Sequence, residues 1–180
     1  MNSGEVNMRM MTGLGILAGL ALVCGPATAT TSINSTFAVQ LTIHAECVIN
    51  STSTLNFGSL GVLGGSGGTA NNDSTATVAV QCTDTTPFDI GLDAGTTTGG
   101  STTTRKLLNQ AQGSTATVNY TLWQDAGHTT TNWGNQVGTD TMSLTGDGTS
   151  HTYTVYGRIP PQMTPAPGTY ADTITVTVTY

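Results

Sequence analysis

Charged side chains are scarce in this 180-residue chain. They make up 8% of the residues, with four Lys or Arg against ten Asp or Glu and a net charge of −6 at pH 7. Nucleic-acid-binding proteins neutralise phosphates with clustered Lys and Arg, and segments that bind anionic lipid surfaces use similar basic clusters. The sequence has no such cluster, which excludes both kinds of partner.

Threonine takes the place of charge. Residues 30–180 contain 36 threonines. Threonine is β-branched, favours strands and presents a hydroxyl group without a charge. A threonine-rich, charge-poor surface suits a chain that packs against copies of itself.

The sequence also lacks a long apolar run. The apolar stretch at residues 14–23 covers roughly ten positions, whereas a helix that crosses a bilayer needs about twenty. Arg9 precedes this stretch, and Ala27-Thr28-Ala29 follows it as an A-x-A cleavage site. This pattern predicts a removable signal peptide over residues 1–29, export through the periplasm and no stable membrane insertion. The alternatives are a short membrane anchor and a lipoprotein acylated at Cys24, although Val23 is bulky for that processing. Initiation can be at Met1 or at Met8.

Cysteine is nearly absent. Cys24 would leave with the signal peptide, so the exported chain would keep only Cys47 and Cys82. An even pair in an exported chain predicts a disulfide bond, which contributes roughly 3–4 kcal/mol for a loop of this length. The alternative is a pair of buried free thiols.

The histidines, aspartates and serines of the sequence do not form a known catalytic or metal-binding motif. His44, His128 and His151 are isolated, lack the spacing of a zinc site and are expected in solvent. Asp84, Asp89 and Asp93 lack the spacing of a calcium loop. No serine sits in a G-x-S-x-G elbow between a strand and a helix, because the one match to this pattern, at residues 64–68, lies in a glycine-rich loop. The sequence therefore predicts neither an enzyme nor a cofactor.

Helical periodicity is absent, and alternation of apolar and polar residues replaces it. Glycine-rich or proline-rich turns separate the alternating segments. Strands are predicted over residues 37–43, 75–82, 88–92, 116–123, 151–156 and 173–180, with shorter strands near 55–57 and 142–144. This number and spacing of strands predict one all-β domain, an immunoglobulin-like β-sandwich.

The first and last predicted strands have special positions. Phe37, Val39, Leu41 and Ile43 are apolar at alternate positions before the first retained cysteine. Such an arm is an aggregation hazard unless another sheet edge receives it. At the other end of the chain, one face carries Ile174, Val176, Val178 and Tyr180. We therefore predict an arm over residues 30–43 and a domain over 44–180. The alternative is that the arm is the first strand of its own domain.

Several short motifs occur in a fixed order over residues 37–180. They are the alternating strand before Cys47, Leu55-Asn56-Phe57-Gly58, Val78-x-Val80-x-Cys82, Phe88-x-x-Gly91-Leu92-x-x-Gly95, Asn119-Tyr120-x-Leu122-Trp123-x-Asp125, Trp133-Gly134, Tyr156-Gly157-Arg158-Ile159-Pro160, Pro167-Gly168-Thr169-Tyr170-x-Asp172-Thr173 and the terminal alternating strand. In their order and spacing these motifs resemble the spore coat U domain, the pilin-type domain of archaic (Csu-type) chaperone–usher fimbriae.

The resemblance implies a sandwich that lacks its last strand, so that a groove in the sheet stays open. It implies three partners: a periplasmic chaperone that fills the groove temporarily, an outer-membrane usher, and the N-terminal arm of an identical or related pilin subunit. The resulting fimbria would lie on the bacterial surface and support adhesion and biofilm formation. Strand addition of this kind is a known recognition mode.

Two other functions are compatible with the sequence. One is a spore-coat or cell-coat protein that assembles by the same strand exchange. The other is a secreted glycan-binding module, for which Trp133, located after a turn, is the candidate stacking ring.

Overall fold

The computed structural model describes residues 29–64 and 68–180. The predicted signal peptide, apart from Ala29, lies outside these residues, as do residues 65–67. The chain divides into two units, Met1–Gln40 and Leu41–Tyr180. In the first unit, residues 29–40 have no regular secondary structure and are exposed. No helix that could cross a membrane occurs in the described parts of the chain.

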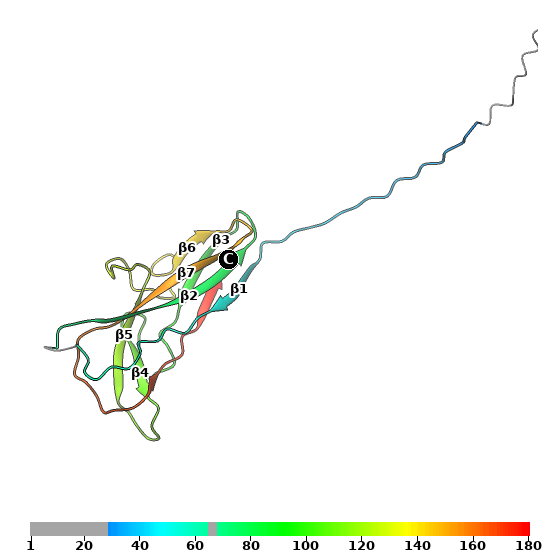
Figure 1. Cartoon of the computed structure of the whole chain (residues 1–180). Coiled ribbons are helices and arrows are strands. Elements are labelled where there is room, and N and C mark those ends of the chain that lie inside the picture. Colours follow the sequence, from blue (N-terminus) through cyan, green and yellow to red (C-terminus); the bar gives the residue numbers. More distant parts are fainter. Residues whose placement is uncertain (1–28, 65–67) are drawn as a thin grey trace, which may run out of the picture. The chain divides into compact units, whose positions relative to one another are not determined.

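The second unit contains all the described strands, which form two antiparallel sheets (Figure 1). In chain order the strands are β1 (Cys47–Thr52), β2 (Asn72–Cys82), β3 (Pro87–Leu92), β4 (Arg105–Asn109), β5 (Thr117–Trp123), β6 (Met142–Thr145), β7 (Ser150–Ile159), β8 (Tyr170–Ala171) and β9 (Val176–Thr179). The larger sheet has the order β1-β2-β7-β5-β4-β8 and the smaller one has the order β6-β3-β9. The predicted all-β, immunoglobulin-like sandwich is confirmed.

Alternation of side chains builds the core. In β2, Val78, Val80 and Cys82 are buried, whereas the residues between them lie on the outer face. β5 follows the same rule, with Val118, Tyr120 and Leu122 buried. Because successive side chains of a strand point to opposite faces, these strands cover the core with one face and present a mostly polar face, which includes several threonines, on the other side.

The predicted disulfide bond between Cys47 and Cys82 is present. The two residues lie directly opposite each other in the β1–β2 pair, with their Cα atoms 4.1 Å apart. Ladder contacts continue only to Thr52 and are interrupted between Ile49 and Ser51. The covalent bond therefore fastens the end of a short, irregular strand at which the preceding arm joins the domain.

Removal of this bond should destabilise the domain. Replacing Cys47 and Cys82 together with alanine is expected to lower the free energy of unfolding by roughly 3–4 kcal/mol, the value for a loop of this length. Urea unfolding of the double variant, compared with the parent chain under oxidising conditions, measures the loss. Equal unfolding midpoints would contradict this expectation. An added reductant should reproduce the effect in the parent chain and leave the variant unchanged.

The structure corrects three predicted strands. Residues 37–43 have no regular secondary structure in the free chain. Residues 55–57 do not form a strand. The backbone pairing of β1 with β2 ends where the Ser53 N–H donates to the Thr77 carbonyl. Beyond this point, the Asn56 carbonyl accepts from the Ser74 hydroxyl instead of from a backbone amide. The strand predicted over 173–180 is observed as β9, Val176–Thr179. Strands β1, β4 and β8 were not predicted from the sequence.

Candidate functional site

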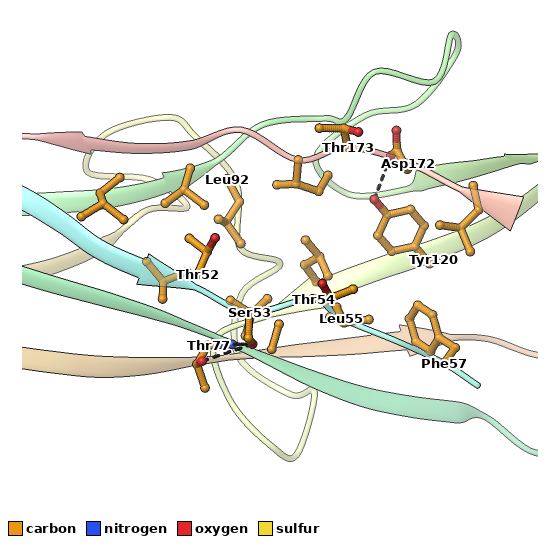
Figure 2. A pocket seen from close by; sticks show the side chains of 18 residues that line it. Thr52, Ser53, Thr54, Leu55, Phe57, Thr77, Leu92, Tyr120, Asp172 and Thr173 are labelled. Carbon is orange, nitrogen blue, oxygen red and sulfur yellow. Dashed lines mark hydrogen bonds between the residues drawn. The ribbon is translucent and has the colours of Figure 1, made fainter.

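An open groove of about 500 Å³ lies in the second unit, between the segment that follows β1 and the segment that leads into β9. Most of the residues that line it are apolar: Ile49, Leu55, Phe57, Ala76, Val78, Leu92, Leu107, Tyr120, Leu122, Val155, Ile174 and Val176. Figure 2 shows Leu55 and Phe57 on one side and Asp172 and Thr173 on the other, with Tyr120 between them. The apolar residues at the rim of the groove are exposed or only partly buried, namely Ile49, Leu55, Phe57, Leu107, Ile174 and Val176, and a further strand in the groove would cover them.

One wall of the groove is an unpaired strand edge. β9 is the last strand of the smaller sheet and, among residues 29–64 and 68–180, pairs only with β3. Just before β9, the Thr175 carbonyl accepts from the Asp93 N–H, and the Thr175 N–H donates to the Asp93 carboxylate. The backbone of Thr175 thus faces the β3 side. Since backbone groups alternate along an antiparallel strand, those of Ile174, Val176 and Val178 face the open edge.

The bonds of β3 agree with this assignment. The Leu92 N–H donates to the Gly134 carbonyl, and its carbonyl accepts from Arg105. The Ile90 carbonyl accepts from the indole of Trp133. Leu92 and Ile90 lie opposite Val176 and Val178 in the β3–β9 register. Their backbone groups are bonded elsewhere, which leaves the corresponding groups of β9 available to a further strand.

The opposite wall belongs to the other sheet. β1 is one of the two edge strands of the larger sheet. The groove runs along Thr52, the last residue of β1, and then along Ser53 and Thr54. Ile49 on this wall is 40% exposed. The groove therefore separates the free edges of two sheets, where one added strand would lie beside both.

A polar cluster occupies the groove end near Phe57. Asp172 accepts hydrogen bonds from the Tyr120 hydroxyl at 2.8 Å and from the backbone and hydroxyl groups of Thr96 and Thr97. Burial, reinforced by the bond to Asp172, raises the pKa of Tyr120 well above its usual value. Tyr120 is thus a neutral donor, and the carboxylate of Asp172 is fully engaged with groups of its own chain.

Arg105 stabilises the loops next to the groove residue Leu92. Its side chain is completely buried and donates to four backbone carbonyls, those of Leu92, Asp93, Thr102 and Trp133. Burial lowers the pKa of its guanidinium group from the usual value. The residue ties the end of β3 to two loops, so that Leu92 keeps its place in the groove wall. The sequence analysis did not single out Arg105.

The predicted arm residues lie in solvent. Phe37, Val39, Leu41 and Ile43 are 87%, 84%, 85% and 75% exposed. No regular secondary structure is assigned to them. Their role as a donor strand stays a prediction, as does the role of Ile174, Val176, Val178 and Tyr180 as the receiving edge. The groove residues Ile49, Leu107 and Tyr120 were not identified from the sequence as site residues.

Two residues were misjudged from the sequence. Trp133 is fully buried, and its indole N–H donates to the Ile90 carbonyl, so it is not a stacking surface for sugars. His128 lies half-buried between the rings of Trp123 and Tyr156, with centroids 6.0 and 6.4 Å away, instead of in solvent. No group of three His, Cys, Asp or Glu side chains that could hold a metal occurs within 29–64 and 68–180.

The sequence profile of the Spore Coat Protein U domain matches residues 33–177. The chain belongs to the Spore Coat Protein U domain family. The match begins inside the predicted arm and ends in β9, so this family domain contains both walls of the groove. The resemblance predicted from the motifs is confirmed. No curated protein matches the chain.

The fold of this Spore Coat Protein U domain also occurs in a solved structure. That structure is the CsuC–CsuE chaperone-tip adhesion subunit pre-assembly complex from archaic chaperone-usher Csu pili of Acinetobacter baumannii. The similarity covers 77% of this chain and 40% of the other, with a TM-score of 0.52 and 21% identity. The chain thus spans less than half the length of the protein it matches, and the likeness establishes a shared fold.

Proposed function

We propose that the protein is a structural subunit of a bacterial surface fimbria that assembles by the chaperone–usher route. The observation that carries this proposal is the unpaired β9 edge beside an open apolar groove. An arm from a neighbouring copy would supply the missing strand. The similar solved structure, a pre-assembly complex of a chaperone and a tip adhesion subunit of chaperone-usher pili, supports the same interpretation.

The arm matches the groove in chemistry and in length. The four apolar arm residues at alternate positions would lie beside the edge segment 174–180 of the acceptor, which also has four apolar residues at alternate positions. Burial of the four arm side chains contributes about 6–12 kcal/mol before the costs of association and ordering are subtracted. Backbone hydrogen bonds to β9 then fix the register of the arm.

Two transient partners follow from this mechanism. A subunit whose groove is open to water would aggregate before assembly, so a periplasmic chaperone covers the groove first. An outer-membrane usher then exchanges the chaperone for the next arm. The finished homopolymer lies on the cell surface, where it supports adhesion and biofilm formation as a structural protein and not as an enzyme. A spore or cell coat that assembles by the same exchange is the second candidate. The burial of Trp133 argues against the glycan-binding module.

Deletion of residues 30–43 tests the proposal. The shortened subunit should still form a complex with the chaperone, because its groove is intact, but it cannot be a donor. Polymer should therefore be lost, measured as the heat-resistant ladder on a denaturing gel. A chain of unchanged length in which residues 30–43 are shuffled is the matched control, and it should fail as well. Polymer formation by the deleted subunit would refute the proposal.

A further inference from the structure

We infer that the loop surface of Leu60, Val62 and Met163 is a contact through which one copy of this chain abuts the next. The inference rests on the proposed function, because it assumes that the arm of one copy enters the groove of another. It assigns a partner, a second copy, to a surface that lies outside the groove.

The loop surface exposes large apolar side chains. Leu60, Val62 and Met163 are 42%, 62% and 91% exposed. The two loops that carry them are joined by the Leu63 N–H, which donates to the Thr164 hydroxyl at 2.9 Å. Leu63 itself is 7% exposed and anchors its loop in the core. Apolar side chains gathered on an anchored surface are typical of a protein contact.

The loop surface continues from one end of the groove. Phe57 lines the groove, and the loop with Leu60 and Val62 follows it directly. Met163 lies in the loop after Ile159, the last residue of β7, and Ile159 pairs with Asn72 at the start of β2. We call this the loop end of the domain.

The arm leaves the domain at the opposite end. Cys47 pairs with Cys82 at the far end of β2. The Glu46 N–H donates to the Thr83 hydroxyl, and the Thr83 N–H donates to the Glu46 carbonyl. We call this the arm end of the domain. β9 also runs toward it, because Thr179 lies opposite Asp89 near the start of β3.

The direction of the arm in the acceptor decides which ends meet. An arm parallel to β9 would exit at the acceptor's own arm end and bring two arm ends face to face, which favours a closed pair. An arm antiparallel to β9 exits at the loop end of the acceptor and leaves the acceptor's arm end free. Only the antiparallel direction lets each copy receive an arm from one neighbour and give its own arm to another, which produces an open chain with one repeated contact.

The connection between arm and domain is too short to keep the two bodies apart. Only residues 44–46 separate Ile43 from Cys47, and the four steps between these Cα atoms span at most about 14 Å. With Ile43 seated near the loop end of the acceptor, the arm end of the donor must rest against that loop end. Val48 and Tyr180, 48% and 60% exposed, lie at the arm end and offer apolar partners to the loop surface.

Photo-crosslinking tests this contact in fibres assembled from the full mature chain. Benzoylphenylalanine replaces Val62 in one preparation and Leu41 in another. Irradiation should join neighbouring copies in both, with the Val62 product mapping to residues 44–48 or Tyr180 and the Leu41 product mapping to the groove. A Leu41 product without a Val62 product, or a Val62 product formed only with the chaperone, overturns the inference and leaves the proposed function standing. Absence of both products overturns both.

Substitution provides a second readout. The double variant Val62→Asp, Met163→Asp should still polymerise, and its groove should bind a peptide of residues 30–43 within about twofold of the parent affinity, because both sites are on the surface. Its polymer should dissociate about tenfold faster in urea, because the contact then buries carboxylates without partners. Val137→Asp is the matched control, since Val137 is 53% exposed and lies outside the loop surface. Equal dissociation rates for the double variant, the control and the parent chain overturn the inference.

Discussion

Replacement of Leu41 with aspartate is expected to abolish polymer formation. Leu41 belongs to the apolar face of the arm and is 85% exposed in the free chain, so the substitution leaves the folded domain intact. In the acceptor groove, however, the new carboxylate would be buried without a partner at a cost of several kcal/mol. A loss of about 3 kcal/mol already weakens arm binding more than 100-fold.

The matched control is Thr42→Asp. In an extended arm, Thr42 would point to the face opposite Leu41. The carboxylate introduced at position 42 would therefore stay in water, and the polymer should persist. The heat-resistant gel ladder measures both variants, and recovery of the chaperone complex shows that the groove of each is unchanged. Equal ladders from Leu41→Asp and the parent chain would rule out the arm as the donor strand.

The second large effect is expected from Arg105→Met. The substitution leaves four carbonyls without their donor, of which those of Leu92 and Trp133 are buried and the other two are partly buried. Each unsatisfied buried group costs about 1–3 kcal/mol. A net loss of roughly 4 kcal/mol or more is a large part of the stability of a typical domain. We expect a strongly reduced urea midpoint and low recovery of the chaperone complex.

Lys106→Met is the control for Arg105→Met. Lys106 is the next residue in β4, but it is only half-buried and its ammonium group donates to one side chain, that of Asn119. Its replacement should change the free energy of unfolding by less than about 1 kcal/mol. Similar midpoints for the two variants would show that the bonds of Arg105 to the carbonyls contribute little.

The sequence predicted the strands whose side chains alternate clearly. Residues 75–82 and 116–123 alternate between apolar and polar residues, and both are found as strands, β2 and β5. These segments are half-buried, so their periodicity records the position of the core. The disulfide bond was also predicted, because two cysteines in an exported chain leave a single possible pair.

Other features could not be predicted because they depend on contacts between residues that are distant in the sequence. β4 contains Arg105-Lys106-Leu107-Leu108, in which apolar and polar residues do not alternate. Arg105 can be buried because four carbonyls from the end of β3 and two loops accept its hydrogen bonds. Trp133 follows a turn and looked accessible, yet the fold places it in the core beside Ile90. The groove itself depends on how two sheet edges are spaced, which no local pattern records.

The free edge of β9 has a mechanical consequence under the proposed assembly. The arm would lie along this edge, so tension on the fibre would act nearly parallel to both strands. Such a pull loads the hydrogen bonds in shear, and they must break together instead of peeling apart one after another. A joint held by four side chains and a short ladder could thus resist a sudden force far better than its equilibrium affinity suggests.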